Sequence, residues 1–159
     1  MLKQFAPIAR MPPSPKKKAW MIKAMETAMT ATSGPVGCVI VREGAVVARA
    51  GNRTVADQDP TAHAELIAIR QAAAALGSER LTDCDLYVTL EPCTMCTAAM
   101  SFARIRRLYF GAADPKGGAV EHGVRFFASP TCHHRPEVYG GIGETECAAL
   151  LKEFFQARR

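Results

Sequence analysis

The chain has 159 residues, of which 48% are hydrophobic, a length and composition that suit one domain with a sizeable core. No apolar run approaches the roughly 20 residues that cross a bilayer, and the N-terminal stretch carries prolines where a signal peptide has its apolar segment. The sequence therefore predicts a cytoplasmic protein rather than a membrane or secreted one. The formal net charge of +5 allows a polyanionic partner, but it fits ordinary solvated surfaces equally well.

The first elements are a lead-in and a helix. Residues 1–15 are rich in proline and lack periodicity, so we expect a mobile N-terminal segment followed by a single domain over 16–159. From Lys16 to Thr30, apolar residues recur every three or four positions, which predicts an amphipathic helix with its methionines in the core. These positions are Trp20, Met21, Ala24, Met25, Ala28 and Met29.

A hairpin and a second helix follow. The apolar runs 36–41 and 45–50 flank Arg42-Glu43-Gly44, which predicts a β-hairpin whose two strands are largely buried. Asp59 is the expected N-cap of the next helix, with Pro60 at its first position. This helix should end near Leu76, with Gly77 as its C-terminal cap.

The second half of the chain alternates strands and helices. Strands are predicted over 85–90 and 107–111, with a helix over 93–103 between them. A short strand is expected over 138–140, and the segment 144–157 predicts a closing helix. Its expected inner face consists of Leu150, Leu151, Phe154 and Phe155. The order predicts an α/β fold, a mixed sheet of about five strands between two helix layers.

Six cysteines without a signal peptide favour reduced or metal-bound thiols over disulfides. Cys38, Cys84 and Cys147 lie in apolar or helical patterns, which indicates buried thiols. Cys132-His133-His134 offers three ligand types in a row, but adjacent residues rarely converge on one ion, so we do not expect a second metal site there.

His63-Ala64-Glu65 and Pro92-Cys93-Thr94-Met95-Cys96 carry the strongest chemical signal. His63, Cys93 and Cys96 make a set of three zinc ligands, and catalytic zinc sites keep three protein ligands while structural sites use four. Both motifs lie at expected helix starts, where unpaired N–H groups and the helix dipole favour thiolates. The sequence therefore predicts a catalytic zinc ion that activates water for hydrolysis.

Glu65 is the expected proton carrier of such a site. Attack of water on an amidine-like carbon requires that one proton leave the water and that protons reach the ring nitrogen and the leaving amine. One carboxylate can do both. A lone glutamate in the first turn of a helix usually stabilises the helix dipole, but its place beside His63 and the cysteine pair favours catalysis.

The H-x-E and P-C-x-x-C pattern resembles the zinc-dependent cytidine and nucleobase deaminase superfamily. Further matches resemble the bacterial tRNA-specific adenosine deaminases and run from about Trp20 to Arg159. They include Pro35-Val36-Gly37, Gly51-Asn52-Arg53, Asp59-Pro60-Thr61, Tyr87 through Leu90, Phe110-Gly111-Ala112 with Asp114 and Lys116, and Glu144 through Arg159. The resemblance implies a cytidine-deaminase-like fold and a homodimer that converts adenosine to inosine at the wobble position of a tRNA anticodon.

The resemblance also assigns residues. His63, Cys93 and Cys96 would bind one Zn2+ per subunit, and Glu65 would shuttle protons. The pocket of the flipped base would be lined by Val36, Asn52, Ala64 and Leu90. Contacts with flanking nucleotides of the anticodon loop would come from Asp114, Lys116, His134, Arg158 and Arg159.

One segment departs from the family pattern, and two other functions stay open. The loop 119–130 contains Phe126 and Phe127, which would either stack on bases or, as we expect, pack in the core. A zinc-dependent deaminase of a free nucleobase or nucleoside, of guanine or cytidine type, would use the same site without a basic rim. A non-catalytic zinc-stabilised RNA-binding module is the third reading, and Glu65 argues against it.

Overall fold

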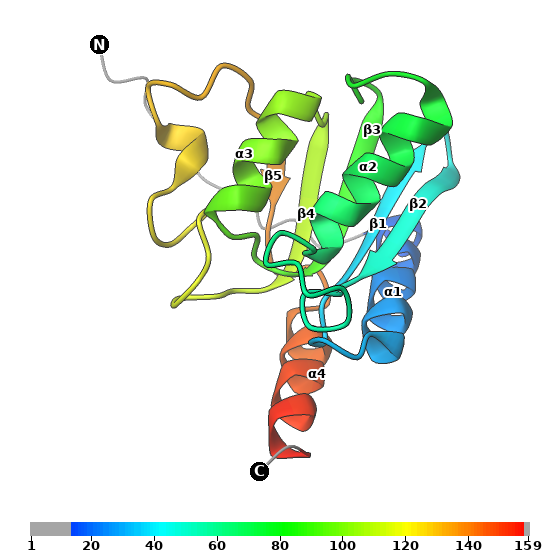
Figure 1. The fold of residues 1–159 in the computed structure, drawn as a ribbon, viewed down its shortest axis with the longest axis vertical. Coiled ribbons are helices and arrows are strands. Elements are labelled where there is room, and N and C mark those ends of the chain that lie inside the picture. The colour runs from blue at the N-terminus through cyan, green and yellow to red at the C-terminus, as the bar shows by residue number, and fades with distance from the viewer. Residues whose placement is uncertain (1–13, 158–159) are drawn as a thin grey trace.

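The computed structural model describes residues 14–157 and shows a five-stranded mixed sheet with helices on both faces (Figure 1). The sheet order is β2-β1-β3-β4-β5, and only the pairs β3–β4 and β4–β5 are parallel. The strands are β1 (Gly37–Arg42), β2 (Ala45–Gly51), β3 (Cys84–Leu90), β4 (Arg107–Ala112) and β5 (Glu137–Tyr139). The helices are α1 (Pro15–Thr30), α2 (Ala64–Leu76), α3 (Thr94–Ala103) and α4 (Glu144–Gln156), with a short 3-10 helix η1 (Phe126–Ala128).

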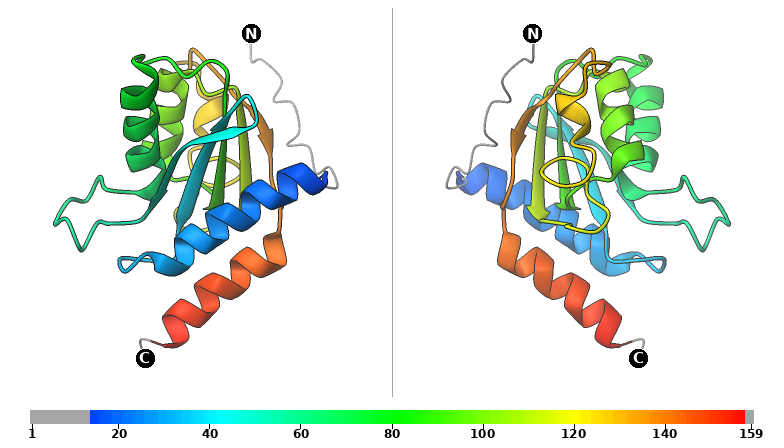
Figure 2. Two further views of the ribbon diagram at one scale, coloured as in Figure 1. Left: turned by 90° about the vertical axis from the view of Figure 1, so that its right-hand side faces the viewer. Right: turned by 90° about the vertical axis from the view of Figure 1, so that its left-hand side faces the viewer.

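Two layers of helices enclose the sheet, which confirms the predicted three-layer α/β/α class (Figure 2). Helices α2 and α3 cover one face, and α1 and α4 lie on the other. The predicted short strand near 138–140 is present as β5. The expectation for residues 1–15 lies outside the described residues, apart from Ser14, which caps α1, and Pro15, which begins it. None of the described helices is long and apolar enough to span a bilayer.

The contact between α1 and β1 depends on a glycine. Met21 and Ala24 of α1 are buried against the sheet. Gly37 passes so close beneath the helix that an added Cβ would overlap the backbone of Ala24 and Ala28. The methionine prediction for α1 is correct only in part, because Met29 is 70% exposed at the end of the helix.

Gly37→Ala is expected to destabilise the protein, because neither the strand nor the helix backbone can move away without breaking its hydrogen bonds. Over-packing of this kind costs about 1–3 kcal/mol. For a chain of this length the midpoint of thermal unfolding should fall by roughly 2–4 °C per kcal/mol. Circular dichroism melts check this, with Gly77→Ala as the reference for backbone strain without a clash. A Cβ at Gly77 meets nothing within 4 Å, but its φ of +63° strains an alanine, so Gly77→Ala should lose some stability and Gly37→Ala should lose more. Equal midpoints for the two variants would contradict the packing argument.

The hairpin lies where the sequence predicted it, but the prediction that both strands are largely buried holds for β1 and not for β2. All but the last residue of β1 is buried, as expected for a strand between two others. In β2 only Ala48 and Ala50 are buried, and Arg49 between them is exposed, because β2 is the edge strand and α2 covers one of its faces.

The predicted start of the second helix is wrong. The α2 helix begins at Ala64 with His63 as its N-cap, not at Pro60 with Asp59 as the cap. The Asp59 carboxylate accepts hydrogen bonds from the backbone N–H and the hydroxyl of Thr61, at 2.8 and 2.7 Å. Asp59 therefore closes a local turn instead of a helix, a competition common for aspartate. The prediction for the third helix is close, with Cys93 as the N-cap of α3.

The closing helix α4 projects beyond the sheet (Figure 1). Only Cys147 of α4 is buried, and Phe155, which we expected on an inner face, is 61% exposed. The reason is positional, since the first turns of α4 pack on β4 and the later turns pass its edge.

The loop between β4 and β5 is compact. Phe127 in η1 is 2% exposed and belongs to the core, which confirms core packing over a stacking surface for this ring. Cys38, Cys84 and Cys147 are buried as predicted. Cys132 is also buried, and its thiol donates to the backbone carbonyl of His134 at 3.1 Å.

Candidate active site

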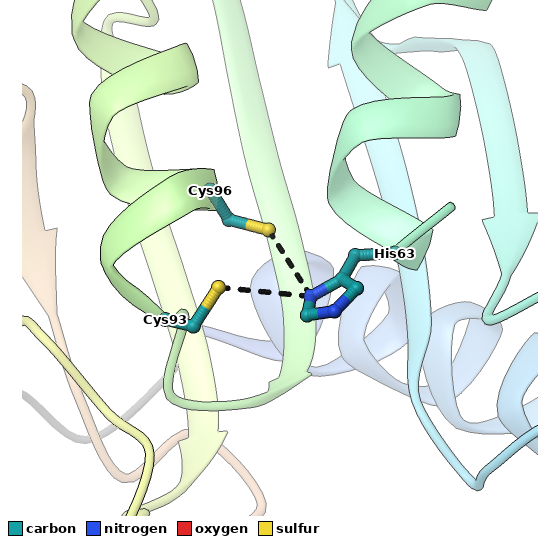
Figure 3. Close-up of side chains that lie close together, drawn as sticks. All are labelled: His63, Cys93 and Cys96. Atoms are coloured by element: carbon teal, nitrogen blue, oxygen red, sulfur yellow. Dashed lines mark hydrogen bonds between the residues drawn. The ribbon is translucent and has the colours of Figure 1, made fainter. Parts of the chain in front are cut away.

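Two helix N-termini meet near the carboxyl end of the central strand β3 and bring three metal-binding side chains together (Figure 3). His63 is the N-cap of α2, and Cys93 is the N-cap of α3. Cys96 lies one turn further along α3, so that its sulfur is on the same face as that of Cys93. The ligand atoms of the three residues lie within 4.8 Å of one another.

The distances in this cluster fit a tetrahedral zinc ion. The Nδ1 atom of His63 is 3.6 Å from the sulfur of Cys93 and 3.6 Å from that of Cys96. Zinc bonds of about 2.3 Å to sulfur and about 2.1 Å to nitrogen, at a tetrahedral angle, separate these atoms by about 3.6 Å. The side chains thus stand at the spacing that a shared ion requires, and three ligands leave one position open.

The thiols are arranged to lose protons to a cation. Contact with Cys96 lowers the pKa of the Cys93 thiol, burial opposes this, and contact with His63 lowers it further, to about 4. Contact with Cys93 and then burial raise the pKa of Cys96 far above its ordinary value, because two thiolates so close together repel each other. A divalent cation removes that repulsion and allows both sulfurs to be thiolates.

Glu65 lies beside this cluster without belonging to it. The residue is in the first turn of α2 and is only 3% exposed. Burial raises the pKa of its carboxyl group, although contact with Cys96 and the charge of His63 oppose this. A buried carboxyl group whose pKa is raised holds a proton more readily than an exposed one, which suits a group that accepts and returns protons.

A cavity of about 210 Å³ opens onto these residues. Its walls contain Val36, Asn52, His63, Ala64, Glu65, Leu90, Glu91, Cys93, Asp114 and Gly117. The structure therefore brings together the metal donors, the predicted proton carrier and all four residues that the sequence placed around the base. Of the predicted outer contacts, Asp114 is in the wall, and the exposed Lys116 lies next to it on the same loop.

The side-chain oxygen of Asn52, in the cavity wall, is a hydrogen-bond acceptor without a partner among the described residues. Its Nδ2 atom donates to the backbone carbonyl of Ser33 at 2.8 Å, which fixes the orientation of the amide. The Oδ1 atom is buried and has no hydrogen-bond partner among the described residues. A buried acceptor without a partner costs free energy, so a bound molecule that donates a hydrogen bond here would gain affinity.

Glu91 is a wall residue that sequence reasoning did not single out. It is 2% exposed and receives hydrogen bonds from the loop that follows β4. Burial raises the pKa of its carboxyl group, but the N–H of Asp114 and the side chain of His122 outweigh this and leave the pKa below its ordinary value. The sequence does hold a signal for Glu91: an acidic residue between an apolar strand and Pro92-Cys93 is expected to be buried, and a buried carboxylate needs a polar partner.

The remaining predicted substrate contacts are His134, Arg158 and Arg159. The imidazole Nε2 of His134 is 2.7 Å from the backbone carbonyl of Ile105, and the residue is not in the cavity wall. Arg158 and Arg159 fall outside the described residues. Within residues 14–157, His63, Cys93 and Cys96 are the residues found to bring three such ligand atoms together.

The site agrees with the family comparisons. Residues 14–112 match the model of the cytidine and deoxycytidylate deaminase zinc-binding region. The chain is 65% identical over 125 residues to a tRNA-specific adenosine deaminase of Agrobacterium fabrum, covering 79% of this chain and 82% of the relative. The chain belongs to the tRNA-specific adenosine deaminases. The resemblance found in the motifs is thereby confirmed, and this protein is a zinc-dependent deaminase.

Solved structures place this deaminase among its relatives. One, from work on A-to-I editing by tRNA:A34 deaminases at the wobble position of transfer RNA, matches with a TM-score of 0.82 and 60% identity. The match covers 84% of this chain and 99% of the solved one. A guanine deaminase of Bacillus subtilis matches with a TM-score of 0.59 and 39% identity, over 60% of this chain and 64% of the other. The superfamily fold thus serves more than one base, and the surroundings of the metal must select the substrate.

Proposed function

We propose that this protein hydrolyses adenosine to inosine at the wobble position of a tRNA anticodon, as one deaminase domain over 16–159. The observation that carries the proposal is the cavity in which three metal donors, the buried Glu65 and the unused acceptor of Asn52 meet. Its volume of about 210 Å³ suits one nucleoside, so a base must leave its stack to enter.

His63, Cys93 and Cys96 hold the zinc ion in this proposal. Zinc at such a site supplies a Lewis acid that lowers the pKa of water to about 7. Glu65 accepts one proton from the attacking water and delivers it to N1 of the adenine ring, then accepts the second proton from the new C6 hydroxyl group and delivers it to the departing amine. The balance is adenosine plus water giving inosine plus ammonia.

The remaining walls position the nucleoside. Val36 and Leu90 contact the faces of the ring, and the backbone of Ala64 offers a polar contact beside the metal. The buried Oδ1 of Asn52 accepts a hydrogen bond from an N–H or O–H group of the nucleoside. The place of the four residues around one cavity supports these roles.

Flanking nucleotides lie outside the cavity in this proposal. Asp114 and Lys116, on a loop at the cavity wall, are placed to reach them. We extend the same role to Arg158, Arg159 and His134 on the family resemblance alone. We also propose that the protein is a cytoplasmic homodimer, as the family resemblance suggests. Phe102 on α3 is 78% exposed and offers an apolar contact for the second subunit.

A transfer RNA whose anticodon begins with adenosine provides the direct test. We expect purified protein to produce inosine at that position, detected by nuclease digestion and mass spectrometry, and to leave free adenosine, guanine and cytidine largely unchanged. The matched substrate carries guanosine at the same position. Deamination of a free base or nucleoside without inosine in the RNA would favour the alternative, a small-molecule deaminase with the same zinc chemistry.

Asn52→Leu is expected to raise KM by about 10- to 100-fold, because it removes a hydrogen bond and leaves the substrate donor unpaired. Zinc content should not change, since Asn52 does not contact the metal donors. Gln71→Leu on the exposed side of α2 is the control for an amide-to-leucine change. Steady-state kinetics on the RNA substrate measure both, and an unchanged KM for Asn52→Leu would remove this residue from substrate binding.

A further inference from the structure

We propose that Glu91 is a positioning residue whose carboxylate holds the loop from Asp114 to His122 in place as one wall of the substrate pocket, and that this anchor controls substrate affinity. The inference rests on the proposed deaminase function, because it concerns the same cavity. It assigns a role to two residues, Glu91 and His122, that neither bind the metal nor carry protons.

The anchor consists of five hydrogen bonds on one carboxylate. Oε1 of Glu91 accepts from the backbone N–H groups of Val120, Glu121 and His122, at 3.2, 2.8 and 3.0 Å. Oε2 accepts from the backbone N–H of Asp114 at 2.9 Å and lies 2.9 Å from Nδ1 of His122. An ionised carboxylate only accepts hydrogen bonds, so Nδ1 is the protonated ring nitrogen.

These hydrogen bonds leave Glu91 unable to act as a proton carrier in the reaction. A carboxylate has about four lone-pair positions, and the loop fills them. Glu91 therefore has no acceptor left for a water molecule or a substrate, although it lines the cavity. Of the two buried carboxylates here, Glu65 is the one that is free to exchange a proton, and Glu91 is committed to the loop.

The loop is shaped to enclose this carboxylate. An added Cβ at Gly118 would lie 2.5 Å from the backbone oxygen of Asp114 and 2.5 Å from Cδ of Glu91. Gly123 has a φ of +57°, which lets the chain turn back, and a Cβ there would meet the oxygen of Gly118 at 2.5 Å. Glycine at both positions allows the backbone N–H groups to converge on a single buried anion, as in anion-binding backbone nests.

The same anchor joins the wall to the metal site. Glu91 directly follows β3 and lies two residues before Cys93. The N–H of Glu91 donates to the carbonyl of Ala112 at 2.8 Å, and the N–H of Ala119 donates to the carbonyl of Pro92 at 2.8 Å. The loop thus holds Asp114 and Gly117 at the cavity by bonds to the turn that carries the cysteines. If the anchor is lost, the wall should move while the metal donors and Glu65 stay.

Glu91→Gln tests the anchor. Whichever way the new amide turns, its NH2 group faces an N–H donor of the loop and repels it. We expect KM to rise by about 10- to 100-fold with kcat within about threefold of wild type and zinc content unchanged. Hydrogen exchange measured by mass spectrometry should accelerate in the peptide spanning 113–123 and not in β4 or α2.

His122 supplies a second, milder test that does not replace the buried charge. His122→Ala removes one of the five bonds and should raise KM in the same direction by less. His122→Asn retains an N–H donor near the position of Nδ1 and should restore much of the affinity. Asp85→Asn is the matched control, since this acid at the start of β3 accepts two hydrogen bonds from Arg106 far from the cavity, and its loss should leave KM unchanged.

The outcomes separate this inference from the proposed function. Wild-type turnover of the RNA or of a free nucleoside decides the function, and the variants are then measured on whichever substrate the wild type uses. Wild-type KM in both Glu91→Gln and His122→Ala would overturn the anchor, as would a fall in kcat alone or exchange that accelerates throughout the chain. If Glu91→Gln does not fold, the pair His122→Ala and His122→Asn decides the question.

Discussion

Glu65→Gln is expected to lower kcat by about 10²- to 10⁴-fold, the range that a positioned general acid–base contributes. Glu65 is only 3% exposed, and glutamine has nearly the same shape, so the packing around this side chain should be preserved. Glutamine, however, cannot accept the proton of the attacking water. Zinc content should stay at the wild-type level, because the metal donors are His63, Cys93 and Cys96. Rates of inosine formation and metal analysis on the same sample measure both quantities.

Glu153→Gln is the control for this prediction, since Glu153 is exposed on α4, away from the cavity. Its kcat should equal that of wild type. Retention of turnover by Glu65→Gln would remove this residue from the mechanism. RNA binding without turnover by the wild type would instead favour a non-catalytic zinc module.

Cys96→Ala is expected to abolish turnover together with metal binding. The loss of a hydrogen bond to a ligand already weakens zinc binding by about 10- to 100-fold, and the loss of the ligand itself should weaken it more. Because Cys96 is fully buried between the sheet and α3, the metal-free variant should also unfold at a lower temperature. Metal analysis after dialysis, combined with thermal melts with and without a chelator, measures these effects.

Cys84→Ala is the matched control, because Cys84 is equally buried but lies at the start of β3, outside the metal cluster. It should keep its zinc and its activity, and a chelator should lower its melting temperature as it lowers that of wild type. The melting temperature of Cys96→Ala should not respond to the chelator. Zinc retention by Cys96→Ala at wild-type affinity would contradict the assignment of this sulfur.

Predictions from the sequence succeeded where short patterns carry the information. A spacing of three residues places the sulfurs of Cys93 and Cys96 on one face of the predicted helix, and the structure has that helix. They failed at Asp59, where turn and helix-cap chemistry use the same side chain and only the surrounding fold selects one. They failed again at Phe155, because an amphipathic pattern does not say how far the neighbouring sheet extends.

The sequence by itself predicted the metal, its ligands and the reaction class, because donor atoms and helix N-termini are local properties of residue type and spacing. Only the tertiary structure decided how the walls around the metal are built. Glu91 is bound by groups 23 to 31 residues further along the chain, and no periodicity links such distant positions. The burial of a charge and the convergence of distant N–H groups on it arise when the chain folds, and so the role of Glu91 became visible only there.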